Sequence, residues 1–285
     1  MCALALGFYL GDRDLNIHIL GPLVVTDRRL RPLPTVPKPR QVLALLVTHA
    51  DKVVPTSAFL RELWDGTPPR TAMTTLQTYV GQLRRVLATA LEIDVTEVVD
   101  RVLVTETGGY ALSTEMLSLD LSEYVRLDLL GVAAVRAGND EEGARLLRRA
   151  LDLWHGPALV NVEAGPLLEA QISRLEESRR CAQEHRIIAD LRLGAHHTVV
   201  GELFELTAMY PLHESLHGHL MLALYRCGRR SEALAVFRAL RSRLVDELGL
   251  EPSAELLHLQ RSILAADPAL NAPGRDRGRL RVNAS

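Results

Sequence analysis

The sequence predicts two domains, an α+β winged helix-turn-helix domain followed by an all-α domain of tetratricopeptide-like helical repeats. Three observations support this division. Alternating strand patterns occur only before Leu119. Helical spacing of apolar residues fills the chain beyond that point. Two similar helix ends, at Gly194 and Gly228, lie 34 residues apart, which is the period of a tetratricopeptide repeat.

Composition limits the classes of protein that this chain can represent. It has 285 residues, 47% of them hydrophobic, and a formal net charge of −2, so any nucleic-acid binding must use a local basic patch. Cys2, Cys181 and Cys227 form no C-x-x-C pair, which favours a reducing compartment. The apolar opening "MCALALGFYL" is too short to span a bilayer and lacks a basic n-region. We therefore expect a cytoplasmic protein with no membrane partner.

The first domain is expected over residues 16–115, after a flexible extension at residues 1–15. The Pro-rich stretch 31–39 resists regular helix. Short strands around "TETGG" predict a hairpin with a glycine turn. The expected elements are strands at 16–25, helices at 40–50 and 56–64, a loop at 65–70, a long helix at 71–90, and strands at 98–103 and 110–112.

The second domain is expected over residues 119–267, with the boundary at Ser113–Leu119 and a disordered tail at 268–285. Short breaks that carry Gly, Pro or Asn separate its helices. Gly138, Gly194 and Gly228 each follow one helix and precede another. Helices are expected at 120–137, 140–154, 166–193, 196–209, 213–227, 231–248 and 253–265.

The long helix has an unusual polar face. Its apolar stripe comprises Met73, Leu76, Val80, Leu83 and Leu87. The opposite face carries Thr, Gln and Arg, and no acidic residue occurs between Gly66 and Leu91. Such side chains read base edges and bind phosphates, although an ordinary solvated face remains the alternative. An outward glycine, Gly81, costs about 1 kcal/mol against alanine, so it is either tolerated or needed for close approach of DNA.

The order of strands, two helices, loop, long helix and hairpin is that of a winged helix-turn-helix, with the long helix in the major groove and the hairpin as the wing. This arrangement predicts DNA contacts from three places. Base contacts are expected from Thr74, Thr75, Thr78 and Gln82. Phosphate contacts are expected from Gln77, Tyr79, Arg84 and Arg85, and from Arg70 and Thr71 where the helix begins. Wing contacts are expected from Thr105, Thr107 and Tyr110.

The stretch "LHESLH" offers a competing hypothesis, because it matches the H-E-x-x-H zinc pattern through His213, Glu214 and His217. No third ligand is evident, and these residues follow Pro211 at a helix start. We therefore interpret them as a surface helix start and expect no enzyme, catalytic residue, metal or cofactor. A helical-repeat scaffold that binds a protein or peptide is the second alternative.

Several segments resemble the Streptomyces antibiotic regulatory protein family. "ILGPLVV", "KPRQVLALLVTHADKVV", "LRELWDGTPP", "TLQTYVGQLRRVL" and "GGYAL" resemble its DNA-binding half, which is similar to the OmpR-type output domain of response regulators. "LLRRALDLWHGPAL" and the stretch "YPLHESLHGHLMLALYRCGRRSEALAVFRALRSRLVDELGLEPSAEL" resemble its bacterial transcriptional activation domain. The resemblance covers about Asn16 to Ala266. Because no receiver domain and no ATPase domain are evident in this sequence, the chain resembles the small form of the family.

This resemblance implies a transcriptional activator of an antibiotic or other secondary-metabolite gene cluster. Members bind direct repeats of double-stranded DNA at promoters and recruit RNA polymerase, so a homodimer or cooperative binding on DNA is expected. It also implies that a loop between two helices faces polymerase rather than DNA. That loop comprises Asp65, Gly66, Thr67, Pro68 and Pro69.

The sequence departs from the family at two positions on the DNA side. Gln82 stands where the family commonly has arginine in the recognition helix. Glu106 stands in the wing where arginine followed by prolines is common. Glutamine pairs with adenine, whereas arginine favours guanine, so an operator with adenine at the Gln82 position is expected. An acid in the wing is expected to weaken its contact with the minor groove.

Overall fold

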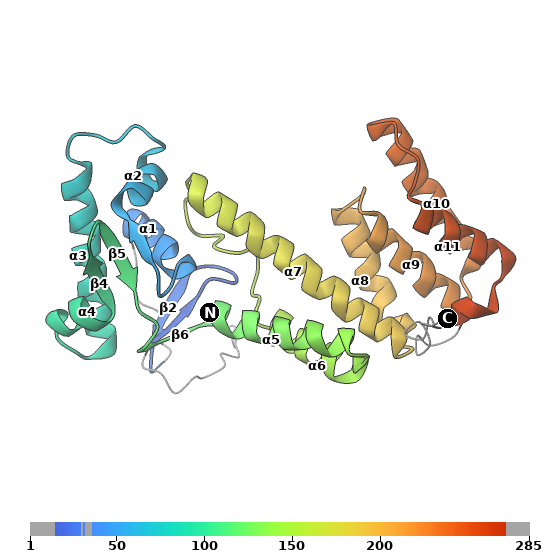
Figure 1. The fold of residues 1–285 in the computed structure, drawn as a ribbon, viewed down its shortest axis with the longest axis horizontal. Coiled ribbons are helices and arrows are strands. Elements are labelled where there is room, and N and C mark those ends of the chain that lie inside the picture. Colours follow the sequence, from blue (N-terminus) through green and yellow to red (C-terminus); the bar gives the residue numbers. More distant parts are fainter. Residues whose placement is uncertain (1–14, 30, 32–35, 272–285) are drawn as a thin grey trace, which may run out of the picture. The chain divides into compact units, whose positions relative to one another are not determined.

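The computed structural model describes residues 15–29, 31 and 36–271. Residues 1–14 of the predicted N-terminal extension and residues 272–285 of the predicted tail lie outside these residues, whereas Leu15 belongs to β1 and residues 268–271 form a short helix. Within the described part of the chain, no helix has an apolar stretch long enough to cross a bilayer. The elements (Figure 1) are β1 (Leu15–His18), β2 (Val24–Asp27), α1 (Pro37–Thr48), β3 (Val53–Pro55), α2 (Thr56–Trp64), α3 (Ala72–Leu91), α4 (Val95–Arg101), β4 (Leu103–Glu106), β5 (Gly109–Leu112), β6 (Leu117–Leu119), α5 (Asp120–Arg136), α6 (Asp140–Leu151), α7 (Pro166–Arg192), α8 (His196–Met209), α9 (Glu214–Arg226), α10 (Arg230–Arg243), η1 (Leu244–Leu248), α11 (Ala254–Ala265) and η2 (Pro268–Asn271).

The described residues form two compact units. The first unit extends to Arg126 and also takes in Ala150–Arg180, and the second comprises Leu127–Arg149 and the chain from Cys181 onward. The winged-helix elements therefore share a unit with the first half of α7. The stretch Ser113–Leu119, which we expect to separate the domains, contains β6, a strand that pairs in parallel with β1.

The described strands form two three-stranded sheets, β2-β1-β6 and β3-β5-β4. Three predictions about this region are wrong. Residues 98–101 belong to helix α4 instead of a strand, because Val98 turns inward on a short helix and the strand starts at Leu103. Helix α1 begins within the Pro-rich stretch, at Pro37, since proline is tolerated in the first turn of a helix. Strand β3 was not predicted, because its three residues are too few to show an alternating pattern.

The helix-turn-helix packs around a continuous apolar core. Helix α1 buries an unbroken run from Gln41 to Val47, and α2 contributes the fully buried Phe59. Helix α3 buries Leu76, Val80, Leu83 and Leu87, as its periodicity predicts. Met73, which the predicted stripe includes, is 42% exposed instead, and Ala72 is buried in its place at the start of the helix.

Asp120 and Asn161 connect the first sheet to the chain beyond it. The Asp120 carboxylate accepts hydrogen bonds from the backbone N–H groups of Ile19 (2.9 Å) and Leu20 (3.0 Å) and from Leu121 at the start of α5. Burial raises the pKa of Asp120 to about 7, and these N–H groups act against that rise. The Asn161 side chain accepts from the backbone N–H of Leu23 and donates to its carbonyl.

Glu62 joins α2 to the start of α7. Its side chain is 3% exposed, and its carboxylate accepts hydrogen bonds from the backbone N–H groups of Gly165 (2.6 Å), Leu167 (2.9 Å) and Leu168 (3.1 Å). The Gln41 amide donates to the backbone carbonyl and the carboxylate of Glu62. A carboxylate is stabilised at a helix N-terminus, where backbone donors lack helical partners. This contact fixes the start of α7 on the helix-turn-helix.

The second unit repeats one kind of helix end, as predicted. Gly138, Gly194 and Gly228 have φ angles of 79°, 86° and 76°, the left-handed conformation that glycine adopts without strain. After each glycine, a backbone N–H bonds to a carbonyl five residues earlier, as in Ala195 to Asp190 (2.9 Å). Helices α8, α9, α10 and α11 pack around a shared apolar core. This is the expected tetratricopeptide-like architecture.

Glu62→Ala is expected to lower the free energy of unfolding by about 2–4 kcal/mol, because it leaves buried N–H groups without acceptors. Glu62→Gln keeps one acceptor oxygen and is expected to cost less. Urea denaturation followed by circular dichroism measures both. Glu169→Ala, an exposed glutamate in the first turn of α7, is the matched control. Equal urea midpoints for Glu62→Ala and Glu169→Ala would contradict the role of Glu62.

Candidate nucleic-acid interface

The outward face of α3 is polar and carries no acidic side chain. Arg70, Thr71, Thr74, Gln77, Thr78 and Arg85 are exposed, and Thr75, Tyr79, Gln82 and Arg84 are half-buried. The structure therefore brings most of the predicted contact residues onto one surface. Met73 lies exposed among them, although its apolar side chain predicts a position in the core.

Two threonines on this face are held by the helix backbone. The Thr75 hydroxyl donates to the Thr71 carbonyl (3.0 Å), and the Thr78 hydroxyl donates to the Thr74 carbonyl (2.9 Å). Each hydroxyl oxygen keeps lone pairs that can accept a hydrogen bond, and each side chain also carries a methyl group. These groups suit cytosine or adenine amino groups and the thymine methyl group in the major groove.

Gly81 leaves open space beside the outward face. A Cβ atom built at this position would have only the Arg85 Nη2 atom nearby, at 4.0 Å. Packing within the protein therefore does not require glycine here. A glycine at this position makes the helix less stable than an alanine would. This supports the interpretation that another molecule approaches the backbone closely.

The wing is a hairpin of β4 and β5 joined by Thr107 and Gly108. Thr105, Glu106 and Thr107 are exposed at its tip. The hairpin is held against β3, where a Cβ atom at position 109 would lie 2.2 Å from the Val54 carbonyl oxygen. Only glycine allows this close approach of the two backbones, so Gly109 fixes the position of the wing.

Arg84 ties the wing to α3. Its guanidinium donates to the Leu103 carbonyl (2.7 and 3.0 Å) and to the Thr105 hydroxyl (2.7 Å). It also lies over the ring of Tyr110, 5.9 Å from the ring centroid. Burial lowers the pKa of Arg84 from its ordinary value, but an arginine remains charged in proteins. This structural role was not predicted, because no local pattern links Arg84 to Leu103, which lies 19 residues further along the chain.

Tyr110 is a packing residue, which corrects the prediction that it contacts DNA. It is 7% exposed, and its ring meets that of Phe59 edge to face, with centroids 5.9 Å apart. A side chain buried in this way has no surface to offer a groove. The error arose because alternation along β5 does not reveal which side of the strand faces the core.

The loop between α2 and α3 projects into solvent. Asp65, Gly66, Thr67, Pro68 and Pro69 are all exposed. Asp65 and Gly66 have φ angles of 46° and 81°, which end α2 abruptly. The Thr67 N–H then bonds to the Trp64 carbonyl (2.9 Å). The turn predicted to face polymerase is therefore exposed.

The side chains of the H-E-x-x-H stretch are engaged within the second unit. Glu214 accepts a hydrogen bond from the backbone N–H of Ser253 (2.7 Å), and His213 accepts one from Leu216 at the start of α9. His217 is 6% exposed, so the prediction of a surface position is wrong for this residue. Burial lowers the pKa of His217. Among the described residues, no group of three or more His, Cys, Asp or Glu side chains is arranged to hold a metal.

Two family profiles match the chain in the same order as its elements. Residues 31–112 match "Transcriptional regulatory protein, C terminal", and residues 119–264 match "Bacterial transcriptional activator domain". No enzyme family is indicated. These two matches cover the winged helix and the helical repeats, respectively.

Known proteins share this organisation. Regulatory protein DnrI of Streptomyces peucetius is 45% identical over 260 residues, which cover 91% of this chain and 96% of DnrI. Regulatory protein AfsR of Streptomyces coelicolor is 41% identical over 261 residues, and the chain spans only 25% of its length. The structure of Mycobacterium tuberculosis EmbR in complex with a low affinity phosphopeptide has a TM-score of 0.82 and 32% identity, covering 91% of this chain and 68% of EmbR.

The order of the two domains, the polar face of α3 with its attached wing, and the near full-length similarity to DnrI lead to one assignment. The chain belongs to the Streptomyces antibiotic regulatory protein family of transcriptional activators.

Proposed function

We propose that this protein activates transcription of a secondary-metabolite gene cluster by binding direct repeats in promoter DNA and recruiting RNA polymerase. The outward face of α3 is the observation that carries the proposal. It is exposed, free of acidic side chains and adjacent to an exposed hairpin tip. These properties match a recognition helix in the major groove with a wing beside it.

In this proposal, the residues of α3 and those directly before it have two kinds of contact with DNA. Thr74, Thr75, Thr78 and Gln82 read base edges. Gln77, Tyr79, Arg70, Thr71 and Arg85 bind phosphates on either side of the groove. Arg84 holds the wing in place, and its charge adds to the attraction of phosphate.

The remaining surfaces serve protein partners. The exposed loop Asp65–Pro69 faces polymerase, because it lies between the two helices of the motif and carries no basic side chain. Two copies bind adjacent repeats cooperatively, since the second binding event gains effective concentration from the first. A purely structural helical scaffold would need neither the polar face of α3 nor the wing.

Arg85→Ala is expected to weaken binding to promoter DNA by about fivefold to tenfold, roughly 1 kcal/mol, because one charged phosphate contact is lost. The slope of log K against log salt is expected to become shallower by about one unit. Fluorescence anisotropy with promoter and random DNA at several salt concentrations measures both. Arg61→Ala is the matched control, since Arg61 is an exposed arginine on α2. Equal effects of the two substitutions would count against α3 as the DNA-binding element.

Gly81→Ala separates stability from binding. The substitution is expected to raise the free energy of unfolding by about 0.5–1 kcal/mol, because alanine favours helix and the added methyl group meets open space. DNA binding is expected to weaken by about 1–3 kcal/mol through a clash with the approaching DNA. Thermal denaturation and anisotropy measure the two effects. A stability gain without loss of DNA affinity would show that Gly81 is merely tolerated.

Gln82 and Glu106 are expected to set sequence preference and salt dependence. Gln82→Arg should shift the preferred base from adenine toward guanine, by about 1–3 kcal/mol of discrimination. Glu106→Arg should tighten binding to all sequences and steepen the salt dependence, because the exposed wing acid repels phosphate. Selection of binding sites from a random DNA pool compares wild type with both variants. Identical preferred sequences and identical salt slopes would contradict both roles.

A further inference from the structure

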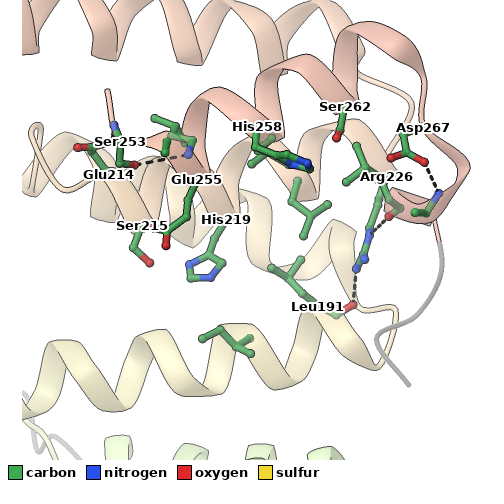
Figure 2. Close-up of a pocket in the computed structure, with 18 of the residues that line it drawn as sticks. Leu191, Glu214, Ser215, His219, Arg226, Ser253, Glu255, His258, Ser262 and Asp267 are labelled. Carbon is green, nitrogen blue, oxygen red and sulfur yellow. Dashed lines mark hydrogen bonds between the residues drawn. The ribbon is translucent and has the colours of Figure 1, made fainter. Parts of the chain in front are cut away.

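A cavity of about 1000 Å³ lies within the second unit. Its walls come from the second half of α7, from α9 and α11, and from the short helix η2 (Figure 2). Ile188, Leu222 and Leu259 contribute apolar surface from three of these helices. Cavities that bind small molecules usually have volumes of about 300–1,000 Å³ and apolar walls with a few polar groups. We call this one the repeat-domain cavity.

The acidic side chains of the repeat-domain cavity are used by the protein itself or face water. Glu214 accepts a hydrogen bond from the backbone N–H of Ser253 (2.7 Å), and Asp267 accepts one from the backbone N–H of Ala269 (2.9 Å). Glu255 is exposed in the first turn of α11. The cavity therefore offers no buried carboxylate that needs a cationic ligand.

The cationic side chains of the cavity are also engaged. Arg226 donates to the carbonyls of Leu270 (2.7 Å) and Leu191 (2.8 Å). Arg192 forms an ion pair with Asp140 at 3.2 Å. An anionic ligand would have to compete with these bonds, so the groups that remain available in the cavity are uncharged.

Ser262 supplies one such group. Its side chain lines the cavity from α11, and the residue is 8% exposed. Within the described part of the chain its hydroxyl makes no hydrogen bond. Serine in a helix often donates to the carbonyl four residues earlier, as Ser173 does to Glu169 (2.9 Å). Because buried hydroxyls are normally hydrogen-bonded, this one is placed to donate to, or accept from, a molecule in the cavity.

His219 supplies a second uncharged group, from α9 (Figure 2). Its buried Nδ1 atom lies 3.7 Å from Glu184 Oε1 and has no hydrogen-bond partner among the described residues. Burial lowers the pKa of His219, so the imidazole is neutral at pH 7. A neutral imidazole has one donor and one acceptor nitrogen, which suit the hydroxyl and carbonyl groups of an uncharged molecule.

Gly218 keeps the space between α9 and α11 open. A Cβ atom at this position would lie 3.4 Å from Leu256 Cδ1 and 3.9 Å from Leu259 Cδ2, which are ordinary contact distances. Alanine would therefore fit here, and it favours a helix more than glycine does. Packing within the protein does not require the glycine, whereas access to the cavity benefits from it.

We propose that the repeat-domain cavity binds an uncharged organic molecule that has an apolar ring system and at least one carbonyl or hydroxyl group. The apolar walls cover the ring system, and Ser262 and His219 form hydrogen bonds with its oxygen atoms. This site belongs to the second unit and is independent of the proposed DNA contacts. A bound molecule contacts α7, α9, α11 and η2 together, so it stabilises the folded second unit.

Titration of the full-length protein with prodan, an uncharged fluorescent naphthalene ketone, tests this site. Prodan has an apolar ring system and a carbonyl acceptor, and its emission brightens in apolar surroundings. We expect a saturable rise in fluorescence, with one molecule bound per chain. A rise that stays linear in protein concentration, as for weak contact with many surfaces, would overturn the proposal.

Ala269→Trp locates the binding in the cavity. Ala269 is exposed on η2 and lines the cavity, so tryptophan can occupy the space without entering the core. The affinity for prodan is expected to fall at least about tenfold through steric exclusion. Ala265→Trp is the matched control, since Ala265 is exposed on α11 outside the cavity, and we expect less than about a twofold change. Equal affinities of the two variants would overturn the proposal.

A second blocking variant guards against loss of folding. If Ala269→Trp lacks the helical circular dichroism of the wild type, Ala254→Trp replaces it in the comparison. Ala254 is an exposed residue of α11 that also lines the cavity. The same tenfold loss of prodan affinity is expected for this variant, about as for the first.

Competition with three naphthalene compounds tests the predicted lack of charge. Naphthol, naphthoate and naphthylmethylammonium share one ring system but are neutral, anionic and cationic at pH 7. Naphthol is expected to displace prodan at concentrations about tenfold lower than either ion, because the charged side chains of the cavity are already engaged. Displacement by naphthoate or naphthylmethylammonium at the same concentration as naphthol would overturn the assignment of an uncharged ligand.

Ser262→Ala tests the hydrogen bond to the ligand. Prodan is expected to bind about fivefold more weakly, because one hydrogen bond is lost, and its emission is expected to move to shorter wavelength. Ser262→Thr keeps the hydroxyl and should retain the affinity. Ser231→Ala is the control, since Ser231 is exposed on α10 and does not line the cavity. Equal affinity and equal emission for Ser262→Ala and Ser231→Ala would overturn the role of Ser262.

Discussion

Glu62 brings a carboxylate into the interior of the first unit, where it needs hydrogen-bond donors because water does not reach it. The start of α7 supplies them, from Gly165, Leu167 and Leu168. The backbone approaches equally closely, since a Cβ atom at position 165 would lie 2.2 Å from the Glu62 carbonyl oxygen. Helix α2 cannot shift without losing these bonds. The helix-turn-helix therefore depends on a segment about 100 residues later in the chain, and this contact is one of those that join Ala150–Arg180 to the first unit.

The proposed DNA-binding surface is positioned by similar close contacts. Gly109 brings the wing against β3, and Arg84 joins the wing to α3. Both contacts use backbone carbonyls, which are fixed by the sheet, so the distance between the recognition helix and the wing tip is set before DNA binds. Pre-organisation of this kind reduces the ordering cost of binding. The side chains that remain outside this framework, such as Thr74 and Arg85, are exposed.

Much of the fold could be predicted from the sequence because it depends on local patterns. The apolar spacing of α3 and the glycines that end helices in the second unit are readable without coordinates. Long-range contacts could not be predicted. The burial of Tyr110, the bond from Arg84 to Leu103 and the capping of α7 by Glu62 each join residues that no local pattern connects. The short elements α4 and β3 were not predicted correctly either, because they contain too few residues to establish a period of apolar side chains. Most of the predicted contact residues nevertheless share one surface, because helical periodicity places them on the face of α3 opposite the buried Leu76, Val80, Leu83 and Leu87.

DNase footprinting of the full-length protein on the promoters that flank its gene tests the central claim most directly. The account predicts protection of two direct repeats, each centred on a major groove. The spacing between them should bring both copies to the same side of the duplex, because a whole number of helical turns separates equivalent major-groove surfaces. Protection should be lost with Arg85→Ala at protein concentrations where Arg61→Ala retains it. Uniform protection along the DNA, or no protection at any concentration at which the protein remains folded, would contradict the account.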